Sequence, residues 1–278
     1  MPLIPLAPPT ARFPRCLSLA LLGALVLSAC TSEPAPQAPT VEADVPRVGA
    51  SFTLATDSLT VRDSLLRYTV AIGYPQIRGS SGEPMSPTLR AVNQAIRDSV
   101  QALADDFRPE MPPPDDDSPM YVVDLEGGPE RSFVSNEVLS VLVNVYAFTG
   151  GAHGSTVFLP LTYDLHTGQA LAPRDLFTPG TPWPDTLAAW TERTVVDEMA
   201  RRLQTTPDSA RASFSAQGLD SIRGGDVAVT MGRDSLRVHI PQSQLTPSVV
   251  GSFDVGVPYP VVRPFARRGS VLARRVAQ

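Results

Sequence analysis

The apolar residues between Leu89 and Phe107 recur at spacings of three and four, and this period restricts the possible folds more than any other feature. Such a period places them on one stripe of an α-helix. Ser86 followed by Pro87 is typical of the cap and the first position of that helix. Just before it, alternating apolar residues in segment 65–77 predict a β-strand. We therefore expect the helix to pack on a sheet.

Further strands are expected in residues 120–126, 138–148 and 155–165. The middle one is apolar on both faces, as a central strand is. Pro160 indicates that the last lies at an edge or contains a bulge. A second long helix is expected at 181–203, a shorter one at 208–219, and a hairpin at 226–240. The pattern predicts an α+β fold, with a mainly antiparallel sheet and two long helices packed on it.

The alternation in hairpin 226–240 also places one histidine. Apolar side chains are expected to face the interior from both strands of this hairpin: Val227, Val229, Met231, Leu236, Val238 and Ile240. Because successive side chains of a strand point to opposite faces, His239 is expected on the wetter face, as a surface residue. His166 falls in a turn and has no visible partner in the sequence.

The N-terminal segment predicts where the protein is located. Arg12 and Arg15 precede an apolar run of signal-peptide length, which is too short for a comfortable membrane span. The run ends in Leu-Ser-Ala-Cys30, which resembles the bacterial lipobox. There the cysteine thiol receives a lipid, and the peptide is cut just before it. A chance cysteine at the end of an ordinary secretory signal or a signal anchor is the alternative.

We accordingly expect a lipoprotein signal peptide at 1–29, lipidation of Cys30, and a disordered tether rich in proline, alanine and acidic residues at 30–48. Two or three acyl chains would give a stable anchor in the bacterial cell envelope. Thr31 after the cysteine resembles default sorting to the outer membrane, if the cell has two membranes. Cys16 lies within the signal segment, so no disulfide framework is expected.

Charge and composition set limits on partners and cofactors. The net charge is −5 and the basic residues are scattered, so no nucleic-acid partner is expected. The acidic run 115–117 could supply oxygen ligands for calcium, but it lacks the spaced pattern of a calcium loop. A solvated loop explains it better. With only three histidines, all far apart, we expect no metal and no cofactor.

The stretch "YAFTGGAHGSTVFLPLTYDLHTG", which begins at Tyr146, contains the candidate site. Gly150 and Gly151 can take positive φ where the hairpin reverses. His153 then follows just beyond the turn, near Tyr146 and Thr149. These five residues are the candidate ligand-binding residues.

Three roles for His153 remain open. As a general base it would need an orienting carboxylate, and Asp164 and Asp175 lie in the same segment without any local feature that places them. As a ligand contact, it offers one donor and one acceptor on a loop that rigid strands hold. As a structural residue, it would tie the loop to neighbouring carbonyls. No complete catalytic constellation is visible, so no catalytic residue is predicted.

A family resemblance rests on "IGYPQIRG", "LRAVNQAIRDSV" and "VLVNVYAFTGGAHGSTVFLPLTYDLHTGQALAPRDLF". These segments resemble the envelope module shared by the extracellular half of the lysozyme-sensing anti-sigma factor RsiV and the N-terminal part of the peptidoglycan deacetylase PdaC. The late segment "VGVPYPVVRPF" also fits. The resemblance covers most of residues 50–266. It implies an N-terminal strand–helix subdomain at 49–112 and a C-terminal RsiV-like α+β domain at 119–268.

The resemblance implies a ligand-binding module without the effector part of either protein, here as a stand-alone lipoprotein. Its most concrete form is a sensor or inhibitor of a lysozyme-type glycosidase, and the acidic chain would steer a basic enzyme toward it. We therefore expect no enzyme activity. Two alternatives remain: an envelope hydrolase that uses His153 on cell-wall material, and a structural lipoprotein associated with peptidoglycan.

Overall fold

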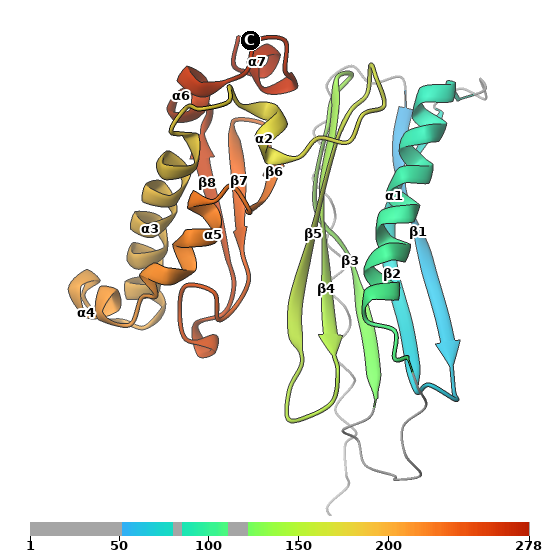
Figure 1. Ribbon diagram of the computed structural model, residues 1–278, viewed down its shortest axis with the longest axis horizontal. Helices are drawn as coiled ribbons and strands as arrows, with labels where there is room; N and C mark the ends of the chain where they lie inside the picture. The colour runs from blue at the N-terminus through green and yellow to red at the C-terminus, as the bar shows by residue number, and fades with distance from the viewer. Residues whose placement is uncertain (1–51, 80–84, 111–121, 278) are drawn as a thin grey trace, which may run out of the picture. The chain divides into compact units, whose positions relative to one another are not determined.

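The computed structural model describes residues 52–79, 85–110 and 122–277 (Figure 1). The predicted signal peptide at 1–29, the lipidation site Cys30, the tether at 30–48 and the acidic run at 115–117 lie outside these ranges. Within them, none of the helices combines the length and the apolarity that spanning a bilayer requires.

The first sheet has five strands in the order β1-β2-β3-β4-β5. Their bounds are Phe52–Asp63, Tyr68–Gly79, Val123–Val134, Val138–Phe148 and Ser155–Asp164. All neighbours are antiparallel except β2 and β3, which are parallel. β5 is at one end of the order, which confirms the edge position predicted from Pro160.

Helix α1, Pro87–Asp106, connects the two parallel strands and packs on this sheet (Figure 1). Its predicted cap is present, because the Ser86 hydroxyl accepts a hydrogen bond from the Leu89 N–H at 3.2 Å. The predicted apolar stripe is confirmed by the helix residues that are fully buried: Val92, Ile96, Val100 and Ala104. They share one core with apolar residues of β2, β4 and β5.

The second sheet has three antiparallel strands, β6-β7-β8, at Ala228–Met231, Ser235–Ile240 and Phe253–Pro258. The long helix α3, Trp183–Arg202, packs against β8, and its buried Leu187, Val195 and Met199 belong to the core of this sheet. Leu203, the last residue of the helix expected at 181–203, follows the helix and is exposed. The short helices are α2 Pro173–Leu176, α4 Pro207–Ala212, α5 Asp220–Arg223, α6 Tyr259–Val262 and α7 Val271–Val276; the 3₁₀ segments are η2 Ala216–Leu219, η3 Ser248–Val250 and η4 Arg263–Phe265.

The predicted α+β fold, with mainly antiparallel strands and two long helices, is confirmed. The strands form two sheets instead of one, and each sheet carries one of the long helices. Because β2 pairs with β3, the strands expected in the separate segments 49–112 and 119–268 share a single sheet. The pattern of apolar residues did not predict β1, most of whose residues are only half-buried or exposed.

Polar contacts link the second half of the chain to the first sheet. The Ser140 hydroxyl of β4 accepts a hydrogen bond from the Met231 N–H of β6 at 2.8 Å. Arg274 of α7 donates to Asp164 at 2.8 Å and to Glu137 at 3.1 Å. Burial alone would raise the pKa of Asp164, but hydrogen bonds from Arg274 and from two backbone N–H groups outweigh it and lower that pKa.

Candidate functional site

The turn between β4 and β5 has the backbone that its glycines predicted. Gly150 and Gly151 have φ values of +93° and +91°, in the region that side chains disfavour. Beyond them, the Gly154 N–H donates to the Tyr146 hydroxyl at 2.9 Å. A Cβ on Gly154 would lie 2.5 Å from the Tyr146 ring, so only glycine lets the loop approach this side chain. Gly154 was not among the predicted site residues.

Tyr146, Thr149 and His153 line one cavity of about 710 Å³. The structure thus brings together three of the five predicted site residues, while Gly150 and Gly151 shape the turn that presents them. The other side of the cavity comes from the segment between β7 and β8, which the sequence did not associate with the loop. Its lining residues are Gln242, Ser243, Ser248 and Val249.

The lining of this cavity is mostly neutral and polar. Its described lining residues offer hydroxyl groups, one amide and one imidazole, and none of them is Asp, Glu, Lys or Arg. Two large apolar side chains stand at the surface here, because Tyr146 is 49% exposed and Val249 is 85% exposed. Exposed aromatic and apolar groups beside polar ones are typical of recognition surfaces.

The geometry bears differently on the three roles of His153. Its side chain is exposed and forms no hydrogen bond with the described residues, so the loop lacks the tie that a structural role requires. A general base lacks its orienting carboxylate, since Asp164 is at the far end of β5 and pairs with Arg274. Asp175 instead accepts from the Ala172 N–H at 2.8 Å. Ligand contact is the role that this exposure suits, and it stays a prediction.

The prediction that His239 is a surface residue was wrong. The residue is 2% exposed. The apolar face of the hairpin was placed correctly, but the opposite face is covered as well. Phe158 of β5 approaches His239 edge-on, with 6.1 Å between ring centroids. Sequence alternation distinguishes the two faces of a strand, but it cannot show that a second sheet covers the polar one.

His239 lies between a hydroxyl and a carboxylate. The Thr230 Oγ1 is 2.7 Å from His239 Nε2, and Asp254 Oδ1 is 3.6 Å from Nδ1. Arg237 holds Asp254 with two hydrogen bonds, of 2.8 and 2.6 Å. The order of groups is that of a Ser-His-Asp triad. However, Thr230 is only 3% exposed, so its hydroxyl is not open to a substrate.

A second cavity, of about 540 Å³, contains His239 in its lining. Phe158 and Gln244 also line it, and Thr156 belongs to both this cavity and the first. Within the part of the chain that the structure describes, the one acidic residue in its lining is Asp226, which is exposed. No local pattern in the sequence could indicate this group, because it joins β5 to a sheet formed much later in the chain.

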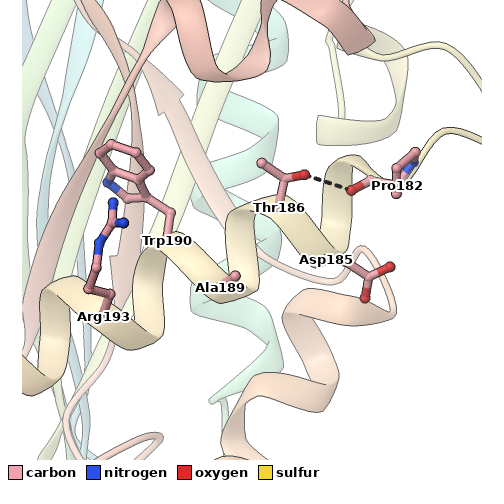
Figure 2. Close-up of a pocket in the computed structure, with 6 residues that line it drawn as sticks. All are labelled: Pro182, Asp185, Thr186, Ala189, Trp190 and Arg193. Atoms are coloured by element: carbon pink, nitrogen blue, oxygen red, sulfur yellow. Dashed lines mark hydrogen bonds between the residues drawn. The ribbon is translucent and has the colours of Figure 1, made fainter.

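A third hollow, of about 380 Å³, lies along the first half of α3 (Figure 2). Its main side chains already have partners: the Trp190 indole N–H donates to the Gly256 carbonyl at 3.0 Å, and the Arg193 guanidinium stacks 4.4 Å from the indole centroid. Thr186 donates to the Pro182 carbonyl at 3.0 Å. We therefore favour the two cavities beside β5 as candidate sites.

No group of three His, Cys, Asp or Glu side chains in the described ranges could hold a metal ion. The expectation that the protein binds no metal or cofactor stays a prediction.

Comparison with protein families supports the resemblance derived from the sequence. The family model described as "Deacetylase PdaC" matches residues 64–156, which contain β2, α1, β3, β4 and the loop with His153. The expected resemblance to the PdaC module is thereby confirmed over this segment.

Known proteins similar to this chain include an esterase of Mycobacterium tuberculosis, 32% identical over 127 residues. The match spans 46% of this chain and 52% of the esterase, so the chain covers about half of that relative's length. Two solved structures of DUF3298 family proteins are also similar. One, from Bacteroides fragilis, has a TM-score of 0.49 at 14% identity and covers 82% of this chain and 99% of its own. The other, from Pseudomonas aeruginosa, has a TM-score of 0.46 at 13% identity, with 78% and 96% covered.

Proposed function

We propose that this protein is a ligand-binding module of the bacterial cell envelope, anchored to a membrane through lipidated Cys30. The observation that carries the binding function is the cavity of about 710 Å³ beside the Tyr146–His153 loop. A rigid hairpin positions an exposed tyrosine and an exposed histidine there, opposite hydroxyl and amide groups from residues 242–249. The signal-like segment that ends at Cys30 supports the location.

The most concrete ligand is a lysozyme-type glycosidase, which this protein would sense or inhibit. The resemblance to the lysozyme-sensing module suggests this ligand. Charge supports it in a general way, because a net charge of −5 favours encounter with a basic enzyme. The cavity lining contributes polar, uncharged contacts at the protruding loop, which suits the rim of a protein interface.

Binding of a lysozyme to the full-length protein, measured by surface plasmon resonance, tests this proposal. His153→Ala should weaken binding while the melting temperature stays unchanged, because the side chain is exposed and forms no described hydrogen bond. His166→Ala is the matched control, since His166 is also exposed but lies in the turn at the opposite end of β5. No measurable binding to the wild type, or equal losses in both variants, would refute the proposal.

An envelope hydrolase is the second candidate, and the row Thr230–His239–Asp254 is the observation in its favour. The similarity to a protein named as an esterase points the same way. Hydrolysis of p-nitrophenyl acetate by the full-length protein separates the two candidates. A hydrolase that uses this row would lose turnover in Thr230→Val, whereas a binding module would show the same background rate in the wild type and the variant.

A further inference from the structure

The main-chain groups of β5 alternate between its two edges, and one hydrogen bond establishes which residues face outward. Leu165 N–H donates to the Glu137 carbonyl at 2.8 Å, on the side of β4. The register continues without a shift from the Val138–Asp164 pair to the Ala147–Ser155 pair. In an antiparallel ladder, every second residue bonds to the partner strand. The odd-numbered residues of β5 therefore bond to β4, and the even-numbered ones direct their N–H and C=O groups outward.

The far end of β5 agrees with this alternation and is already covered. Asp164 N–H donates to the Gln169 carbonyl at 2.9 Å, and Leu171 N–H donates to the Thr162 carbonyl at 2.8 Å. Both bonds lie on the outer edge and involve even-numbered residues of the strand. Pro160 is also even-numbered, so the N–H that proline lacks would have pointed away from β4. Its absence therefore removes no hydrogen bond to β4.

The other end of the edge differs. By the same alternation, Thr156 and Phe158 direct their main-chain groups outward, and no described residue forms a main-chain hydrogen bond with them there. Thr156, Val157 and Phe158 all line the cavity of about 540 Å³. These are consecutive residues of the edge strand, so this cavity lies beside that part of β5. Thr156 also lines the cavity of about 710 Å³.

We propose that this edge of β5 binds an extended peptide segment of a partner protein by strand addition, with the Thr156 and Phe158 main chain as its hydrogen-bonding partners. Strand addition gives affinity through main-chain bonds and specificity through side-chain pockets. The inference rests on the proposed binding function only for its location, since Thr156 borders both cavities. It names a mode of recognition that does not require His153.

The cavity of about 540 Å³ indicates the chemistry of the peptide. Its lining includes three half-buried apolar or aromatic residues, Phe158, Val227 and Ala228. Among the described residues that line it, Asp226 is the only acidic one, and none is Lys or Arg. The complementary segment has an apolar side chain that enters the cavity and a neighbouring Lys or Arg that reaches Asp226.

Selection from a displayed library of random eight-residue peptides tests the proposal, with full-length wild type, Thr156→Pro and Thr156→Ala as targets. Proline removes the outward N–H and places its ring on the edge, whereas alanine keeps the main chain intact. Wild type and Thr156→Ala should enrich peptides with a basic residue beside an apolar one. The Kd of these peptides for Thr156→Pro should be about tenfold or more above their Kd for the wild type, because main-chain hydrogen bonds are lost. Asp226→Asn should reduce the preference for Lys and Arg.

A second measurement applies even if Thr156→Pro fails to fold. The best peptide is synthesised with N-methyl groups at either its odd or its even positions, and each form is titrated into the wild type. Strand addition requires that one form loses binding and the other keeps it. Equal binding of both forms, no enrichment on the wild type, or equal enrichment on Thr156→Pro would overturn the proposal. A wild type that dimerises in ultracentrifugation, while Thr156→Pro is monomeric, would assign the edge to a second copy of this chain and also overturn it.

The two proposals can fail separately. If Thr156→Pro weakens peptide binding but the protein binds no lysozyme, strand addition is supported and the lysozyme-type glycosidase is excluded as the ligand. If His153→Ala weakens lysozyme binding but no peptide is enriched, the glycosidase is supported as the ligand and strand addition is excluded.

Discussion

Replacement of Asp164 by asparagine should destabilise the protein through one well-defined contact. The Asp164 side chain is 12% exposed and accepts a hydrogen bond from Arg274 at 2.8 Å. It also accepts from the His166 N–H at 2.9 Å and the Thr167 N–H at 3.3 Å. Asparagine can still accept the two backbone bonds through its carbonyl oxygen. What it loses is the charge that faces the guanidinium.

A hydrogen bond to a charged partner contributes about 1.5–3 kcal/mol, so we expect a loss of about 2 kcal/mol in the free energy of unfolding. Arg274 keeps its bond to Glu137, which limits the loss. For a domain of this size, the melting temperature should fall by about 4–8 °C. Thermal melts followed by circular dichroism at pH 7 measure this fall in melting temperature. Asp220→Asn is the control, because that carboxylate is 69% exposed and its pair with Arg223 should contribute almost nothing.

The difference between wild type and Asp164→Asn should also depend on pH. The pKa of Asp164 is lower in the folded protein than in the unfolded chain, because the bonds that the carboxylate accepts outweigh the effect of its burial. Its contribution is therefore complete above the unfolded pKa of about 4, and it is lost as the pH falls through the folded value. The gap in melting temperature should narrow below about pH 4. A variant that melts with the wild type at pH 7, or a gap that stays constant down to pH 3, would refute the reasoning.

Three further predictions concern single residues. Gly127→Ala should destabilise the first sheet by about 3 kcal/mol or more, because the added Cβ would lie 2.1 Å from a β4 carbonyl oxygen. Gly128→Ala is the control and should melt near the wild type, because the atom nearest to its added Cβ is 3.9 Å away. Gly154→Ala should displace the Tyr146 ring and weaken ligand binding more than it lowers the melting temperature; a crystal structure with the ring unmoved would contradict this. Metabolic labelling with a fatty-acid probe should mark the wild type but not Cys30→Ala, and equal labelling of both would rule out lipidation there.

Local patterns predicted the elements of this fold well where a segment's burial depends on its immediate neighbours. The stripe of α1 and its Ser86 cap are present as expected, and so are the positive φ values of Gly150 and Gly151. Pro160 marked an edge strand, since proline lacks the N–H that a central strand uses on both sides. In each of these cases the deciding interaction lies within a few residues of the signal.

What the sequence did not predict depends on contacts between distant segments. His239 was assigned to the surface because its own hairpin leaves it on the polar face, yet Phe158 of another sheet covers that face. Ser248 and Val249 complete the cavity near His153 across about a hundred positions of sequence. No local period encodes such a pairing. The candidate site was therefore half predictable, since the loop was visible in the sequence and the surface opposite it was not.

The parallel pairing of β2 with β3 has a consequence for how the first sheet assembles. β1 with β2, and β3 with β4 and β5, are joined by short turns, and such local pairs form quickly. Tyr68, by contrast, meets Val123 only after the chain has passed through the whole of α1. Closing that longer loop costs more entropy before any contact forms. We therefore expect the pairing of β2 with β3 to form last when the sheet folds and to open first when it unfolds. Amide hydrogen exchange should then divide the sheet at this boundary into two cooperative halves.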